Sequence, residues 1–174
     1  MKNIELKMAV NNLKEIEQKL KEVGAVSVGK MKQCDTYYNN QTGRLKVREI
    51  DNQICEVIFY QRPDKTNFKV SDYSIETVPN DQCKNIKRLY GKTYGEKVMV
   101  SKVRNLWFIN NTRIHLDKVK NLGTFLELET VVKGKILGAK NEFDLVVKML
   151  KLGNKAKIKG SYSDILLDKL KIIG

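Results

Sequence analysis

Hydrophobic and polar residues alternate one by one along many short segments of the chain. In the first segment, residues 2–8 (KNIELKM), Glu5 and Lys7 share one face, and Leu6 and Met8 share the other. A period of two is typical of a β-strand with one buried face. The same alternation, or a run of β-forming residues between turn signals, recurs along the chain. We therefore predict eight strands: 2–8, 26–38, 44–49, 54–62, 68–78, 97–109, 112–119 and 124–132.

A helical period of three to four residues appears outside these strands. We predict helices over residues 13–23, 80–90 and 138–152 and over the final segment, GSYSDILLDKL. We expect Asn11 or Asn12 to cap the first helix, Gly91 to end the second, and Ser161 or Ser163 to cap the last. Since hairpin-length turns join many of the strands, the predicted fold class is α+β, dominated by a mostly antiparallel sheet.

The length of 174 residues suits one domain, so we expect a single domain over residues 1–174. No apolar run approaches the ~20 residues that span a bilayer, and the first residues lack the apolar stretch of a signal peptide. We therefore expect a cytoplasmic protein with no membrane partner. Because Cys34, Cys55 and Cys83 are far apart and His115 is the only histidine, we expect neither a Cys/His zinc site nor a disulfide framework.

Charged residues occupy every second position of several predicted strands, always on one face. They form five rows: Glu5 and Lys7; Arg44, Lys46 and Arg48; Lys102 and Arg104; Arg113, His115 and Asp117; Glu127 and Glu129. In an open sheet this face would meet water. In a closed barrel of about eight strands it would line the lumen, at a cost unless opposite charges, a metal or a ligand balance it.

Arginine is rare in this chain and concentrated in these strands. Five of the six arginines fall in predicted strands, although 33 residues are Lys or Arg. The guanidinium group offers a planar fork of donors that suits phosphate oxygens. The net charge of +13 also favours a polyanionic partner. We find no RNP-like, zinc-finger or helix-turn-helix signature, so we do not expect nucleic acid as a partner.

Carboxylates add a second chemical element to the same faces. Glu127 and Glu129 lie two apart on one predicted strand, and Glu5 lies on another. Carboxylate oxygens on a rigid sheet are suitable ligands for Mg²⁺ or Mn²⁺, which bind phosphates at the same time. Together with the rows of Lys and Arg, they indicate a site for a metal–polyphosphate complex.

Several of these segments, taken in order, resemble the CYTH superfamily of triphosphate tunnel metalloenzymes. The opening NIELK resembles the family's E-x-E-x-K signature, and QCDTYY resembles its Q-x-D-x-Y-[FY] strand. RLKVRE, KVR at 102–104, IHLDKVKNLGTFLELE and GSYSDILL match further family segments, the last in the class IV adenylyl cyclase branch. The resemblance implies an eight-stranded antiparallel β-barrel, open at its ends, with helices packed outside and a triphosphate in the lumen.

The resemblance also implies roles for individual residues. It places Lys7, Arg104 and Asp117 near the reacting groups, and Glu5, Glu127 and Glu129 on a divalent metal. The basic residues expected to bind the triphosphate are Lys7, Lys46, Arg48, Arg62, Lys69, Lys102, Arg104 and Arg113. Arg62 or Lys69 would replace the lysine of a Lys-Gly-Pro that many members carry, because this chain has Gln61-Arg62-Pro63.

Asn3 departs from the family signature, since it stands where the first Glu of E-x-E-x-K is expected. An amide accepts through its carbonyl but brings no charge, which bears on a second metal. The function that the resemblance favours is class IV adenylyl cyclase, which converts ATP to cyclic AMP and pyrophosphate. The alternatives are a triphosphatase acting on tripolyphosphate or thiamine triphosphate, and a catalytically weak triphosphate-binding protein. The sequence allows a homodimer.

Overall fold

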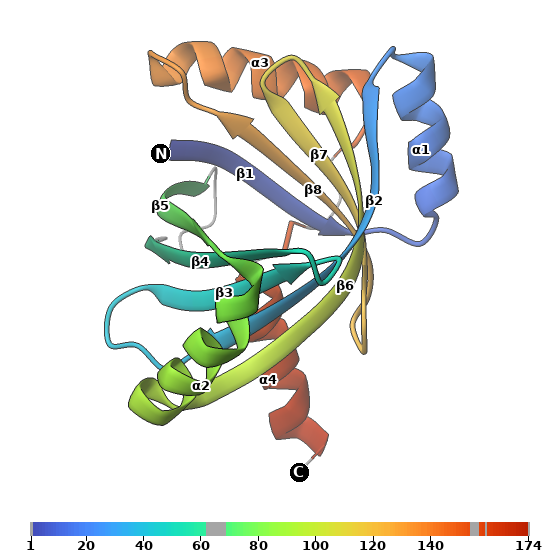
Figure 1. Ribbon diagram of the computed structural model, residues 1–174. Helices are drawn as coiled ribbons and strands as arrows, with labels where there is room; N and C mark the ends of the chain where they lie inside the picture. Colours follow the sequence, from blue (N-terminus) through green and yellow to red (C-terminus); the bar gives the residue numbers. More distant parts are fainter. Residues whose placement is uncertain (1, 62–68, 154–156, 159, 174) are drawn as a thin grey trace.

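The alternating segments form eight strands that close into one antiparallel barrel (Figure 1). The computed structural model describes residues 2–61, 69–153, 157–158 and 160–173. The strands are β1 (Lys2–Ala9), β2 (Val26–Tyr38), β3 (Arg44–Ile50), β4 (Ile54–Gln61), β5 (Lys69–Val78), β6 (Glu96–Ile109), β7 (Thr112–Val119) and β8 (Gly123–Val131). Their order around the barrel is β1-β5-β4-β3-β2-β6-β7-β8, and β1 closes it by pairing with both β5 and β8. The predicted strand-dominated barrel is confirmed.

Four α-helices accompany the barrel. They are α1 (Leu13–Glu22), α2 (Cys83–Tyr94), which follows a short 3₁₀ helix (Asn80–Gln82), α3 (Ile136–Met149) and α4 (Tyr162–Ile173). Asn12 caps α1, since its side-chain oxygen accepts hydrogen bonds from the backbone N–H groups of Lys14 and Glu15. The predicted end of the second helix at Gly91 is wrong. The helix continues to Tyr94 and ends at Gly95, whose φ of 75° suits a residue without a side chain.

The largest apolar core lies on the outer face of the barrel. Outward residues of β1, β7 and β8 meet the buried faces of α1 and α3 (Figure 1), with Trp107 of β6 packed among them. Leu20, Phe143 and Val146 are its fully buried helical members. This burial holds the polar face of the same strands toward the lumen, because alternate side chains of a strand point to opposite faces.

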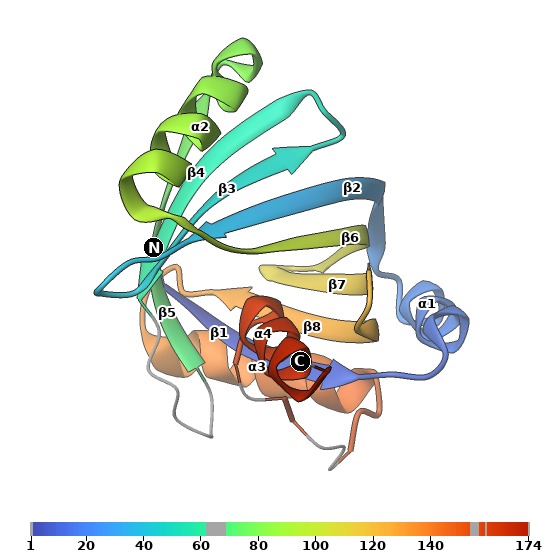
Figure 2. The ribbon, with the colours of Figure 1, turned by 90° about the horizontal axis from the view of Figure 1, so that it is seen from below.

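Helix α4 extends downward from the barrel in Figure 1, and Figure 2 views it from that end. Its residues Tyr162 and Leu166 pack against Tyr37, Val100 and other apolar residues that continue the inward, charged faces of the strands toward one end. The start of α4 therefore contacts one end of the lumen, whereas α1, α2 and α3 cover the outside. This contact was not predictable from the local sequence pattern. No helix in the described residues is long and apolar enough to cross a membrane.

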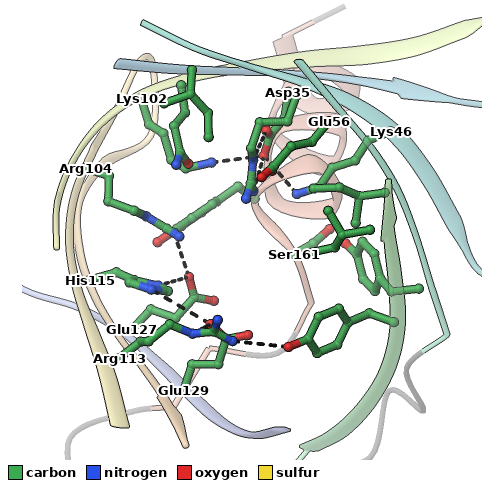
Figure 3. A pocket seen from close by; sticks show the side chains of 18 of the residues that line it. Asp35, Lys46, Glu56, Lys102, Arg104, Arg113, His115, Glu127, Glu129 and Ser161 are labelled. Atoms are coloured by element: carbon green, nitrogen blue, oxygen red, sulfur yellow. Dashed lines mark hydrogen bonds and ion pairs between the residues drawn. The ribbon is translucent and has the colours of Figure 1, made fainter. Parts of the chain in front are cut away.

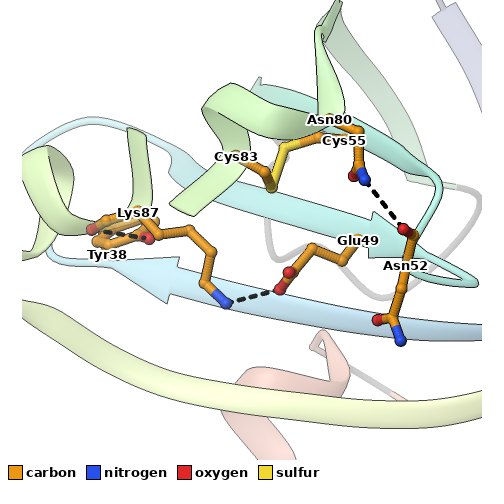
Figure 4. Close-up of a disulfide and its surroundings, with 7 residues drawn as sticks. All are labelled: Tyr38, Glu49, Asn52, Cys55, Asn80, Cys83 and Lys87. Carbon is orange, nitrogen blue, oxygen red and sulfur yellow. Dashed lines mark hydrogen bonds and ion pairs between the residues drawn. A yellow bond between two sulfur atoms is a disulfide. The ribbon is translucent and has the colours of Figure 1, made fainter. Parts of the chain in front are cut away.

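A disulfide joins Cys55 of β4 to Cys83 at the start of α2 (Figure 4). No disulfide framework was expected, and this one bond was not foreseen, because β4 and α2 meet in space although the two cysteines are 28 positions apart. Both cysteines are buried in a small core with Tyr38 and Val47. Nearby, the Lys87 ammonium of α2 lies 2.6 Å from the Glu49 carboxylate of β3. These contacts hold α2 on the outer face of β2, β3 and β4.

Replacing both Cys55 and Cys83 with alanine is expected to lower the free energy of unfolding by about 3 kcal/mol. The crosslink restricts the unfolded chain, and a loop of this length is worth roughly that much. Denaturant unfolding under non-reducing conditions measures the change. The free cysteine supplies the control: Cys34→Ala should shift stability by less than about 1 kcal/mol. Equal stability of the double variant and the oxidised wild type would contradict the crosslink.

Candidate active site

The inward residues of the barrel surround a cavity of about 340 Å³ (Figure 3). Among the described residues, six cationic ones line it: Lys7, Lys46, Arg48, Lys102, Arg104 and Arg113. Five carboxylates in the same part of the chain line it as well: Glu5, Asp35, Glu56, Glu127 and Glu129. Of the two architectures that the alternation allowed, the barrel is the one observed, and its lumen is charged. Such an interior is stable only where opposite charges meet at close range.

On one side of the cavity, three cations converge on Asp35 of β2. Its carboxylate lies 3.0 Å from Lys46 Nζ and 2.9 Å from Lys102 Nζ, and Arg48 approaches it through Nε and Nη2 at 2.7 and 3.0 Å. Burial alone would raise the pKa of Asp35, which is 1% exposed. The three cations outweigh burial and hold that pKa well below its usual value. Asp35 is therefore ionised throughout the physiological range.

The pKa values of the two lysines in this group lie near neutral pH. Burial, together with the neighbouring cations, lowers the pKa of Lys46 to about 7 and that of Lys102 to about 8. Asp35 acts in the opposite direction on both ammonium groups. Arg48 remains a cation, because the Asp35 carboxylate raises its pKa in spite of burial.

Across the cavity, Arg104 of β6 is the centre of a second group. Its guanidinium makes two hydrogen bonds to Asp117 of β7, at 2.8 and 2.7 Å, and a third to Glu127 of β8, at 2.9 Å. Lys7 of β1 lies 3.1 Å from the other Glu127 oxygen. Burial would raise the pKa of Glu127, but Lys7, His115 and Arg104 hold it well below its usual value. Arg104 is thus fixed in direction by two carboxylates, of which Asp117 is buried and Glu127 is partly buried.

His115 forms part of the wall of the cavity. Its Nδ1 lies 3.3 Å from Glu127 Oε2, and the ring is 4% exposed. Burial and the adjacent Arg104 cation lower the pKa of His115, so the ring is neutral at pH 7. It therefore adds hydrogen bonding to the lumen and no charge.

Glu129 anchors a third group near the start of β1. Arg113 Nε lies 2.9 Å from Glu129 Oε2, and Arg113 Nη2 donates to the Tyr73 hydroxyl at 3.3 Å. The side-chain amide of Asn3, which is fully buried, donates to the other Glu129 oxygen. The Asn3 amide therefore hydrogen-bonds to a carboxylate oxygen that would otherwise be available to a metal ion.

The residue types on this side fit a divalent metal. Glu5 lies directly opposite Glu129 in the β1–β8 register, and Lys7 lies opposite Glu127. Three carboxylates on adjacent strands form the oxygen-only donor set that Mg²⁺ and Mn²⁺ prefer. Within the described residues, no three His, Cys, Asp or Glu side chains are already arranged around a metal position. Metal binding there requires Glu127 and Glu129 to exchange their present partners for the ion.

The start of α4 brings two residues to the cavity that the sequence did not assign to a site. Ser161 and Tyr162 line it, and the Tyr162 hydroxyl donates to Asp117 at 2.9 Å. Lys7 Nζ lies 4.0 Å from the centre of the Tyr162 ring, a cation–π contact. As predicted, Ser161 caps the helix, because its hydroxyl accepts from the Asp164 N–H.

The predicted site residues largely converge. Nine of them line the cavity: Glu5, Lys7, Lys46, Arg48, Lys102, Arg104, Arg113, Glu127 and Glu129. Asp117 is completely buried and reaches the site through Arg104. Lys69 is described only as a strand position opposite Glu5, and Arg62 lies outside the described residues. Asp35 was not predicted as a site residue, although Gln33, Asp35 and Tyr37 occupy every second position of one strand and therefore share a face.

Comparison with known proteins gives the family and the fold. A family model described as the CYTH domain matches residues 1–162. A protein of Methanocaldococcus jannaschii named "Putative adenylate cyclase MJ0240" is 24% identical over 177 residues, covering 95% of this chain and 98% of the relative. The solved structure of the PH1012 protein from Pyrococcus horikoshii has a TM-score of 0.79, with 24% identity, covering 93% of this chain and 98% of that one.

A plant structure matches over a similar length. Its published description is "Putative adenylyl cyclase HpAC1 from Hippeastrum reveals a dominant triphophatase activity". It has a TM-score of 0.69 and 13% identity, and the match covers 96% of each chain. At these identities, the two structural likenesses support the fold of the chain.

Proposed function

The chain belongs to the CYTH domain family, whose members are enzymes that act on triphosphates, and on that premise we propose that it is a metal-dependent enzyme that binds a triphosphate in the barrel lumen. One observation carries the proposal. Cationic side chains from β1, β3, β6 and β7 converge on one cavity among the described residues, and three carboxylates suited to Mg²⁺ or Mn²⁺ lie on one side of it. A polyanion with a bound metal matches both the cations and the carboxylates.

The residues that line the cavity have different roles in phosphoryl transfer. Lys46, Arg48 and Lys102 bind phosphate oxygens as an array of donors, and Arg104 and Lys7 stabilise charge that develops in the transition state. Asp117 holds Arg104 in direction and acts through it. A metal bound by the glutamates would supply further neutralisation of the phosphate charge.

Two reactions are compatible with this arrangement. Attack of the 3′-hydroxyl of ATP on the α-phosphorus gives cyclic AMP and pyrophosphate, and attack of water on the terminal phosphorus gives orthophosphate. We favour the cyclase reaction, because the cavity lining includes Met31, Ile50, Ile58 and Leu106, which suit an organic group. The M. jannaschii relative carries the name of an adenylate cyclase. The plant structure, described by a dominant triphosphatase activity, supports the alternative.

Product identification tests this assignment. The protein is incubated with Mg²⁺ or Mn²⁺ and either ATP or tripolyphosphate, and the products are separated by chromatography. Cyclic AMP and pyrophosphate from ATP support the cyclase. Orthophosphate released from tripolyphosphate, with no cyclic AMP formed from ATP, identifies a triphosphatase. An Arg104→Ala variant purified in parallel controls for contaminating enzymes, since the same activity in that preparation would not come from this chain.

Replacing Asn3 with glutamate is expected to raise the affinity for Mn²⁺ by about tenfold, because ligand charge tunes the affinity of carboxylate sites. The new carboxylate would lie against Glu129, so the variant should also melt at a lower temperature without metal. Calorimetry with Mn²⁺ and thermal unfolding with and without the metal measure both effects. Asn3→Gln is the matched control, with the same added length and no charge. Equal Mn²⁺ affinities of the two variants would contradict the prediction.

A further inference from the structure

Asp35 is a buried carboxylate with more cationic partners than it can neutralise. We propose that Asp35 is a positioning residue for triphosphate binding, whose carboxylate holds Lys46, Arg48 and Lys102 together and charged before the substrate arrives. The inference rests on the proposed function and assigns to that site a residue that contacts the phosphate-binding side chains and acts through them.

The strand register explains how one carboxylate reaches three cations. Arg48 of β3 lies directly opposite Asp35, and Lys46 lies opposite Tyr37, the next inward residue of β2. On the other side of β2, Lys102 of β6 lies opposite Gln33, the preceding inward residue. Asp35 is therefore central to the group. Its oxygen Oδ2 contacts all three partners, at 3.0 Å for Lys46, 3.0 Å for Arg48 and 2.9 Å for Lys102.

The group carries a surplus of positive charge. With both lysines protonated, Asp35 balances one of its three partners. Glu56 lies opposite Arg48 in the β3–β4 register and also lines the cavity, so it can balance a second. Among the described residues, at least one buried cation of this group therefore remains unbalanced, which is costly without a ligand. A carboxylate that served only to join β2 to β3 or β6 would need a single partner.

Loss of Asp35 would remove the negative charge that raises the pKa values of the two lysines. Burial already lowers the pKa of Lys46 to about 7 and that of Lys102 to about 8, while the Asp35 charge raises both. The other charged or titratable groups facing these lysines are Tyr37, Arg48, Glu56, Tyr60, Arg104, Asp117 and Tyr162. Without Asp35, both ammonium groups would release their protons at lower pH, and the array would lose charge in the neutral range.

Calorimetric binding of tripolyphosphate to Asp35→Asn and wild type, from pH 6 to pH 9, tests the proposal. The ratio of the two Kd values at each pH cancels the titration of the ligand. We expect the ratio of the variant Kd to the wild-type Kd to be about tenfold higher at pH 8 than at pH 6, because a shift of one pKa unit corresponds to tenfold. Asp35→Glu should restore much of the affinity at pH 8. A ratio near one throughout, or a ratio independent of pH, would overturn the proposal.

Glu49→Gln is the matched control. Glu49 is the next residue of β3 after Arg48, and its partner Lys87 belongs to α2 on the outer face of the barrel. The substitution removes a paired carboxylate from β3, the strand that carries Lys46 and Arg48, without changing a residue of the lumen. It should therefore leave the tripolyphosphate Kd within about twofold of the wild-type value at every pH.

Lysine titration without ligand separates the proposal from the proposed function. Protein labelled with [¹³C]lysine is titrated by NMR, and Lys46→Arg and Lys102→Arg variants assign the two signals. In Asp35→Asn, both midpoints should fall by about one pH unit or more. If the wild type binds no triphosphate, the proposed function fails, and the midpoints alone decide the role of Asp35. Unchanged midpoints would then overturn it.

Discussion

Replacing Arg104 with alanine is expected to lower kcat/KM for the triphosphate substrate by at least about a thousandfold. An arginine that stabilises the transition state of phosphoryl transfer is worth roughly that factor or more. Arg104 is 7% exposed, and its guanidinium donates hydrogen bonds to the carboxylates of Asp117 and Glu127. Its direction is thus set before any substrate binds, which is what electrostatic preorganisation requires.

The same substitution should destabilise the fold. It leaves the buried Asp117 carboxylate without its arginine and the partly buried Glu127 with one cation fewer, and breaking a buried ion pair costs about 3–5 kcal/mol. Arg104→Lys separates the two effects, because it keeps the charge and loses the two-pronged contact with Asp117. We expect that variant to unfold at nearly the wild-type denaturant concentration and still to lose most of its kcat. A variant that kept wild-type kcat/KM would remove Arg104 from the site.

Replacing Glu127 with glutamine is expected to change binding and turnover in opposite directions. The substitution removes a negative charge that contacts Lys7 and Arg104, so tripolyphosphate should bind about tenfold more tightly without metal. It also removes a proposed metal ligand, so metal-dependent turnover should fall by about a hundredfold. Calorimetry in EDTA and assays across a Mn²⁺ titration measure the two effects.

Glu76→Gln provides the control for the Glu127 variant. Glu76 lies on β5 and is exposed, so its loss changes the net charge of the protein by the same amount outside the lumen. It should alter neither binding nor turnover by more than about twofold. If Glu127→Gln kept the wild-type response to Mn²⁺, Glu127 would not be a metal ligand.

Much of the barrel was predictable from local patterns. The alternation in KNIELKM identified which side chains share a face, and the turn residues between strands predicted antiparallel pairing. The patterns left open whether the charged faces point to water or to a lumen. That choice depends on the pairing of β1 with both β5 and β8, which brings together residues more than a hundred positions apart, such as Glu5 and Glu129.

The parts that were missed depend on contacts between distant elements. The Cys55–Cys83 disulfide forms because α2 folds back on β4, and no spacing of cysteines indicated this. The sequence predicts only that Tyr162 belongs to a helix, whereas in the structure its hydroxyl, at the start of α4, donates a hydrogen bond to Asp117. Asp35 lies in the strand segment QCDTYY, and a single acid in a strand does not reveal the three cations that neighbouring strands bring to it.

The single histidine allows a direct test of where a triphosphate binds. His115 lies within the cavity against Glu127, so its imidazole gives one NMR signal that reports on the lumen. Titration with tripolyphosphate and Mg²⁺ is predicted to shift this signal in a saturable way, as Glu127 and Arg104 change partners. A signal that stays in place while tripolyphosphate saturates the protein, or at the highest concentration tested, would contradict a triphosphate site in the barrel.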